Sequence, residues 1–147
     1  MKIINLDIDG TRVDFYGVSG WLDDLENERV RPYMEAKPLV NLSLLARVLN
    51  NLQRNGYEIN IISWTSKSGS ADFHEAVVEA KRAWLKKHIP SVHWDNIFIV
   101  PYGTPKYTLS EGFLFDDEER NRKAWGEGAM TEKNLVKVLM GLLAECK

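Results

Sequence analysis

The sequence has few of the features that mark several common classes of protein. It contains one cysteine, Cys146, so no disulfide can form within the chain. Its three histidines, His74, His88 and His93, do not have the spacing of metal ligands. The formal net charge of −2 lacks the basic excess of nucleic-acid-binding domains. A disulfide scaffold and a histidine–cysteine metal site are therefore excluded, and nucleic acid is a possible but unfavoured partner.

Catalytic arrangements of several familiar kinds are missing too. The chain has no Ser-His-Asp pattern, no thiol nucleophile and no glycine-rich phosphate cradle. No apolar run approaches the length of a membrane span, and a strand predicted from residue 2 leaves no room for a signal peptide. We therefore expect a cytoplasmic protein with no membrane partner. The sequence does not indicate an oligomeric state.

What is present is typical of one globular domain. The 147 residues are 44% hydrophobic and 27% charged, and a chain of this length buries roughly two thirds of its unfolded surface. No internal repeat, low-complexity tract or linker divides it. We predict a single domain over residues 1–147.

The first strand ends in the most informative group of residues. Residues 3–8 form an almost continuous apolar run, typical of a strand buried on both faces of a parallel sheet. The run carries Asp7 and is followed by Asp9 and Gly10. Ligands of open α/β sheets bind at the carboxyl ends of the strands, and paired carboxylates suit a hard cation such as Mg²⁺. The alternative is a simple Asp-Gly turn after a strand.

Strands and helices alternate along the rest of the chain. Hydrophobic periodicity predicts three helices, over residues 39–56, 72–89 and 131–143. Asp72 and Glu75 form a predicted capping box at the start of the helix over residues 72–89. Strands are predicted over residues 57–62, 97–100 and 112–115, with a small edge strand at 129–130. Right-handed crossovers place such strands in one mainly parallel sheet with helices on both faces. The pattern predicts an α/β, three-layer Rossmann-like fold.

Polar groups follow several of these strands. Hydroxyls occur over residues 63–68, Lys106 stands in a loop stiffened by glycine and proline, and Asp116–Asp117 follow the fourth strand. Because parallel strands end at a common edge, these groups are expected to converge with Asp7 and Asp9. Carboxylates that bind a cation, together with hydroxyls and an ammonium that neutralise phosphoryl oxygens, suit phosphoryl chemistry.

Two segments admit more than one interpretation. Residues 12–38 are rich in aromatic and acidic side chains without a clear period; they either fold over the site as a small cap or form a helical connector whose Trp21 and Leu25 pack on the core. A cluster at residues 81–88 contains Lys81, Arg82 and further basic residues. Its position near a helix C-terminus favours a solvated basic face over a nucleic-acid patch.

The sequence resembles the haloacid dehalogenase-like (HAD) phosphohydrolase superfamily over nearly its whole length. Counterparts of the four family motifs occur in order: Asp7-Ile8-Asp9-Gly10-Thr11, Ser63, Lys106, and Asp116-Asp117. Within the second and third motifs, Thr65 is an alternative to Ser63, and Lys67 is a more distant alternative to Lys106. The short insertion resembles that of capless or minimally capped members. The region from Asp7 to Tyr16 resembles the 5′(3′)-deoxyribonucleotidase branch, and the compact form resembles small phage-type members.

The resemblance implies a role for each motif residue. Asp7 would be the nucleophile that forms an aspartyl phosphate, and Asp9 would be the general acid and base. Ser63 would donate a hydrogen bond to a phosphoryl oxygen, and Lys106 would offset the negative charge of Asp7 and the phosphate.

The same resemblance implies Mg²⁺ as the cofactor. The Asp7 carboxylate, the backbone carbonyl of Asp9 and Asp117 would hold the ion, and Asp116 would assist indirectly or as a direct ligand. Loss of Asp7 or Asp9 is the usual mark of a non-catalytic relative, and both aspartates are present.

The resemblance and the aromatic residues together favour a small substrate. Tyr16, Trp21 and Tyr33 are candidates to stack on a base, and Thr65 and Gly10 to contact the phosphate. We therefore predict a Mg²⁺-dependent phosphomonoesterase for a nucleotide or another small phosphorylated metabolite. The alternatives are a phosphatase for nucleic-acid ends or phosphoproteins, and a HAD-like binding protein without turnover.

Overall fold

The computed structural model describes residues 2–9, 13–14 and 17–146. Five parallel strands form a sheet in the order β5-β4-β1-β6-β7, which confirms the predicted parallel α/β fold. The strands are β1 (Ile3–Leu6), β4 (Glu58–Trp64), β5 (Asn96–Val100), β6 (Phe113–Phe115) and β7 (Ala129–Met130). Because β1 lies between β4 and β6, the residues that follow these strands are neighbours at one edge of the sheet.

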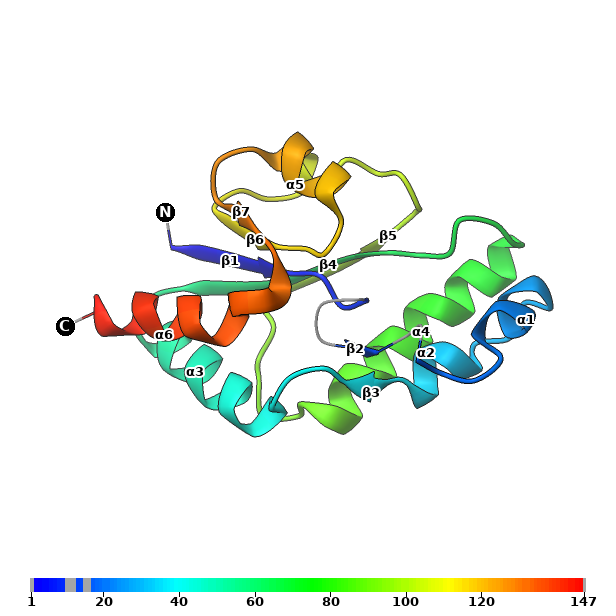
Figure 1. The fold of residues 1–147 in the computed structure, drawn as a ribbon, viewed down its shortest axis with the longest axis horizontal. Helices are drawn as coiled ribbons and strands as arrows, with labels where there is room; N and C mark the ends of the chain where they lie inside the picture. Colours follow the sequence, from blue (N-terminus) through cyan, green and yellow to red (C-terminus); the bar gives the residue numbers. More distant parts are fainter. Residues whose placement is uncertain (1, 10–12, 15–16, 147) are drawn as a thin grey trace.

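Helices cover both faces of the sheet, as Figure 1 shows. On one side lie α3 (Leu42–Arg54), α4 (Ala71–His88) and α6 (Leu135–Ala144), with α3 packed against α6. On the other side lie α5 (Glu119–Trp125) and the 3-10 helix η1 (Lys106–Thr108); a second 3-10 helix, η2 (Glu132–Asn134), precedes α6. Among the described residues, no helix combines the length and the apolarity that crossing a membrane requires.

The main core lies between the sheet and the layer of α3, α4 and α6. Ile4, Leu6, Ile59 and Ile61 of the central strands face this layer, and Leu49 of α3 is fully buried against them. Alternate residues of the buried strands point to opposite faces, so the same strands present a second set of side chains to α5 and η1. The continuous apolar runs of the sequence thus follow from coverage on both faces.

Local sequence signals explain where the elements begin and how closely they approach. The Asn41 side chain accepts a hydrogen bond from the backbone N–H of Leu44 (3.1 Å) and begins α3. Ser70 performs the same function for α4 by accepting from Phe73, so the predicted capping box at Asp72 was wrong by two residues. Gly112, with φ +88°, precedes β6, where an added Cβ would lie 2.6 Å from the Ile3 carbonyl oxygen. Only glycine allows this close approach.

The segment predicted as an insertion contains two short helices and a two-stranded sheet. These elements are α1 (Trp21–Glu26), α2 (Arg31–Glu35), β2 (Val13–Asp14) and β3 (Lys37–Pro38), and the two strands are antiparallel. Tyr33 of α2 packs with Phe73 and Val77 of α4 in a second, smaller hydrophobic cluster. Glu28, between the two helices, accepts a hydrogen bond from the Ser70 backbone N–H (2.5 Å). The segment is therefore joined to the first turns of α4.

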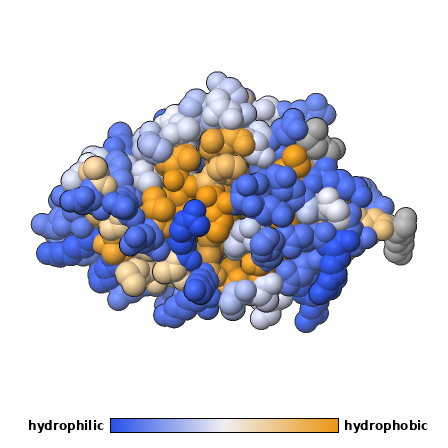
Figure 2. Space-filling view, turned by 180° about the vertical axis from the view of Figure 1, so that it is seen from behind, coloured by the Kyte–Doolittle hydropathy of each residue, from blue (hydrophilic) through white to orange (hydrophobic). Residues whose placement is uncertain are grey.

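Figure 2 shows the molecule from behind, with a hydrophobic area near the centre of this face surrounded by polar residues. The edge strand β5 lies on this side, and its four apolar residues, from Ile97 to Val100, are half-buried. One guanidinium nitrogen of Arg82 lies 3.4 Å from the Ile97 carbonyl oxygen at this edge. The edge of the sheet is thus partly covered by a charged side chain, a common way to discourage further strand pairing.

Candidate active site

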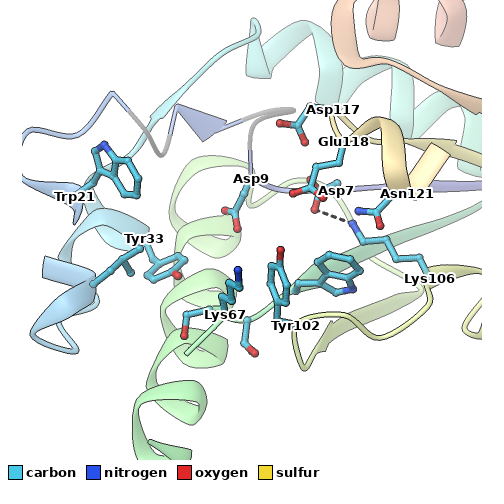
Figure 3. Close-up of a pocket in the computed structure, with 14 residues that line it drawn as sticks. Asp7, Asp9, Trp21, Tyr33, Lys67, Tyr102, Lys106, Asp117, Glu118 and Asn121 are labelled. Atoms are coloured by element: carbon cyan, nitrogen blue, oxygen red, sulfur yellow. Dashed lines mark hydrogen bonds and ion pairs between the residues drawn. The ribbon is translucent and has the colours of Figure 1, made fainter. Parts of the chain in front are cut away.

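Three carboxylates meet where β1 and β6 end. Asp7 follows β1, and Asp116 and Asp117 follow β6; one carboxylate oxygen of each lies within 4.8 Å of one from each of the others. Parallel pairing places Leu6 beside Phe115, so the next residues of both strands emerge side by side. Figure 3 shows Asp7 and Asp117 on this edge, with Asp9 nearby. The convergence predicted for the two ends of the chain is present in the structure.

Lys106 lies beneath this group of acids. Its ammonium donates to Asp116 Oδ2 (2.6 Å) and Asp7 Oδ1 (3.2 Å), and it also lies 3.3 Å from the Ile62 carbonyl oxygen. Burial by itself lowers the pKa of Lys106, but the charges of Asp7 and Asp116 outweigh it and the pKa is raised. Lys106 is therefore held in its charged form beside the Asp7 carboxylate.

Among the residues that the structure describes, no cation forms a salt bridge with Asp117. Burial and then the negative charge of Asp116 raise its pKa from 3.8 to about 6. A divalent cation would offset both causes by supplying a positive partner. Three clustered carboxylates are also the oxygen donors that Mg²⁺ prefers. The donor set thus fits the implied metal ion.

The hydrogen bonds of Asp116 distinguish it from the other two acids. It is fully buried; its Oδ1 accepts from the Glu118 backbone N–H (2.9 Å), and its Oδ2 accepts from Lys106 and from Asn121 (3.1 Å). Asp117 is partly exposed and lines the pocket. Asp116 is therefore placed to orient Lys106, and Asp117 to meet a bound ion.

The structure separates the two hydroxyls proposed for the second motif. The predicted strand stopped at Ile62, whereas β4 continues to Trp64. Ser63 therefore lies within the strand; it is fully buried and does not line the pocket. Thr65 follows the strand, and its backbone N–H donates to the Val100 carbonyl (2.8 Å). Thr65 lines the pocket, and its buried Oγ1 has no hydrogen-bond partner among the described residues.

Lys81 is the site residue that the sequence interpretation placed wrongly. It was assigned to a solvated basic face, but its side chain is 1% exposed. Its ammonium donates to Asp9 Oδ2 (2.5 Å), to Ser63 Oγ (2.8 Å) and to the Trp64 carbonyl oxygen (2.6 Å). Helical spacing contained a usable signal, because Lys81 lies four residues after Val77 on the buried face of α4.

Several of these side chains line a pocket of about 260 Å³, slightly smaller than most small-molecule sites. Figure 3 shows acids on one side and the rings of Trp21 and Tyr33 on another. Trp21 and Leu25 line the pocket and also pack with the small hydrophobic cluster on α4. The lining residues are Asp7, Asp9, Trp21, Leu25, Tyr33, Trp64, Thr65, Ser66, Lys67, Tyr102, Lys106, Asp117, Glu118 and Asn121.

A second aromatic wall was not predicted. The rings of Trp64 and Tyr102 are 4.8 Å apart, and the Trp64 indole N–H donates to the Thr104 carbonyl (2.8 Å). The Arg120 guanidinium lies 5.0 Å from the Trp64 ring centre and donates to the Tyr102 hydroxyl (3.1 Å). The tilted contact between the rings and the guanidinium beside them hold both rings in place.

Three other residues were predicted to belong to the site: Lys67, Gly10 and Tyr16. Lys67 lines the pocket but Lys106, not Lys67, is the lysine that reaches Asp7. Gly10 and Tyr16 lie outside the described residues.

Two solved structures with a similar fold are phosphatases. The chain superimposes on D,D-heptose 1,7-bisphosphate phosphatase from Burkholderia thailandensis with a TM-score of 0.60 at 16% identity, over 98% of this chain and 99% of that one. It superimposes on the enzyme from B. bronchiseptica, complexed with magnesium and phosphate, with a TM-score of 0.58 at 16% identity, over 99% of both chains. A comparison with curated proteins finds no match. Together with the family match that follows, this fold defines a HAD-type phosphatase.

Within that class the family is also shown. The chain belongs to the family described as 5′ nucleotidase, deoxy (pyrimidine), cytosolic type C protein (NT5C), whose sequence profile matches residues 30–131. The match includes Thr65, Lys81, Lys106 and the Asp116–Asp117 pair, and it begins after Asp7 and Asp9.

Proposed function

We propose that this protein is a Mg²⁺-dependent phosphomonoesterase that acts on a nucleoside monophosphate through an aspartyl-phosphate intermediate. The observation that carries the proposal is the meeting of Asp7, Asp116 and Asp117 with Lys106 at the open end of the sheet. The name of the family supports a deoxyribonucleotide substrate and a cytosolic location. The two aromatic walls support a planar group beyond the phosphate.

In this proposal Asp7 attacks phosphorus, and the bond to the leaving oxygen breaks while Asp9 gives that oxygen a proton. Water then attacks the aspartyl phosphate and gives a proton to Asp9. This hydrolysis releases phosphate and restores the Asp7 carboxylate. Lys106 offsets the charge of the phosphoryl oxygens, and the Thr65 hydroxyl donates a hydrogen bond to one of them. The pocket supports Thr65 over Ser63 for this role, since of these two residues only Thr65 lines it. When bound to Asp7, Asp117 and the Asp9 carbonyl, Mg²⁺ supplies charge stabilisation.

In this proposal the insertion at about residues 12–38 acts as a small cap over the pocket. Trp21, Leu25 and Tyr33 of α1 and α2 line the pocket, and the segment is fastened to α4 by the contact between Glu28 and Ser70. A base would lie between these rings and those of Trp64 and Tyr102. A pocket of about 260 Å³ with two walls supports a mononucleotide rather than a phosphorylated nucleic-acid end.

Phosphate release from a substrate panel tests the proposal. The panel contains 5′- and 3′-(deoxy)ribonucleoside monophosphates, oligonucleotides phosphorylated at either end, and p-nitrophenyl phosphate. We expect Mg²⁺-dependent turnover of mononucleotides that chelation abolishes, no turnover by Asp7→Asn, and unchanged turnover by Glu127→Gln, which alters an exposed acid outside the pocket. Activity in Asp7→Asn, or faster turnover of oligonucleotide ends, would refute the proposal.

A further inference from the structure

Lys81 is an unusual residue to bury. An ammonium removed from water requires strong compensation, and an apolar side chain of similar size often serves stability equally well. Around Lys81 this compensation comes from Asp9, Ser63 and the Trp64 carbonyl. Asp9 is the only carboxylate in this set, and it is partly exposed to the pocket while Lys81 is not. The contact therefore joins a buried cation to a side chain that faces the substrate.

The surroundings of Lys81 fix its ammonium in one place. Ser63 and Trp64 belong to β4, whose ladder with β1 and β5 holds their backbone rigidly. The centre of the Tyr33 ring lies 5.3 Å from Nζ on another side, within cation–π distance. Three elements, β4, α2 and α4, thus determine where the ammonium meets Asp9.

We propose that Lys81 is a positioning residue for Asp9. Its ammonium holds Oδ2 of the carboxylate, so that Oδ1 is the oxygen that gives a proton to the leaving group and later takes one from water. Lys81 does not line the pocket, and it acts through Asp9 and not on the phosphate. Lys106, by contrast, contacts Asp7 and Asp116. The two buried lysines of the site therefore serve different aspartates. This inference rests on the proposed function.

The dependence of rate on the leaving group tests this role. A nucleoside 5′-phosphate releases an alkoxide-like oxygen that needs a proton, whereas p-nitrophenolate leaves without one. The value of kcat/KM reports the steps up to cleavage of the ester bond for both substrates. Loss of a positioned general acid costs about 10²–10⁴-fold on the first kind of substrate. A merely structural residue would affect both substrates alike.

The experiment compares the wild type with Lys81→Met, Asp9→Asn, their double variant and Lys87→Met, the last an exposed lysine on the same helix. We expect Lys81→Met to lower kcat/KM on the best nucleotide roughly 100-fold but to change it on p-nitrophenyl phosphate several-fold at most. In the Asp9→Asn background the same substitution should add little. Lys87→Met should match the wild type on both substrates.

The outcomes separate this inference from the proposed function. Equal losses on both substrates, no loss on either, or additive losses in the double variant would overturn the role of Lys81 while wild-type turnover still stands. Absence of wild-type turnover would overturn the proposed function itself. Thermal unfolding checks that Lys81→Met folds, and Lys81→Gln is used in its place if it does not. If neither variant folds, Lys81 is needed for the structure itself and the inference is overturned.

Discussion

Replacing Asp117 with asparagine should stabilise the metal-free protein and remove its response to Mg²⁺. The pKa of Asp117 is raised from 3.8 to about 6, first by burial and then by the charge of Asp116. A raised carboxyl pKa means that the folded state disfavours the ionised form, so the unfavourable contribution grows as pH rises from about 4 and is complete above about 6. Asparagine removes the charge and nearly keeps the shape.

The magnitude follows from the size of the shift. About two pKa units correspond to roughly 3 kcal/mol, and because the side chain is partly exposed we reduce this to about 1–2 kcal/mol for solvent screening. For a chain of this length that is a rise in Tm of roughly 3–6 °C at pH 8 without metal. The gain should shrink as pH falls below 6. Wild-type protein should instead gain stability with Mg²⁺, about 2.7 kcal/mol at 100 times Kd.

Thermal unfolding with chelator and with a Mg²⁺ titration, at pH 5 and pH 8, measures both effects. Glu127→Gln is the matched control, because this acid is exposed and lies outside the carboxylate cluster. The reasoning fails if Asp117→Asn lowers Tm at pH 8 without metal. It fails equally if the variant keeps the full Mg²⁺-induced rise in Tm.

Three further predictions concern the pocket and the core. Thr65→Val should lower kcat/KM by about 10²-fold, the usual effect of losing one donor to developing charge, and Ser63→Ala should lower it less; the reverse order in steady-state kinetics would restore Ser63 as the second-motif residue. Tyr102→Ala should raise KM for nucleotides more than KM for p-nitrophenyl phosphate, because it removes part of one aromatic wall; equal changes would argue against base stacking there. Leu49→Ala should reduce the free energy of unfolding by about 2–5 kcal/mol, because the side chain is fully buried, whereas Leu22→Ala, at a position 54% exposed, should change it little in the same denaturant titration.

Residues distant in the sequence could be predicted to meet because parallel strands joined by right-handed crossovers end at one edge of the sheet. Asp7 and Asp117 are separated by most of the chain, yet each follows a short, apolar strand of the parallel sheet. A structure with these two carboxylates far apart would have ended the enzymatic interpretation. Their oxygens lie within 4.8 Å, together with those of Asp116.

The errors share a different cause. Ser63 was placed in a loop because periodicity does not fix where a strand ends, and two more residues of β4 put its hydroxyl in the interior. Lys81 was placed in solvent because its neighbours in sequence are basic, although it lies on the buried face of α4. In both cases the side chain's surroundings come from other elements of the fold.

Hydrophobic periodicity and the residues at the strand exits were sufficient to determine the parallel α/β class and the neighbourhood of the acids, because these depend on local pattern and on sheet topology. The phosphatase superfamily followed from the resemblance of four short motifs to those of a known family. Tertiary packing alone decided which hydroxyl faces the pocket, which lysine contacts which aspartate, and how Trp64 and Tyr102 form a wall with Arg120. Those assignments depend on distances of a few ångströms between side chains from different elements, and no local pattern encodes them.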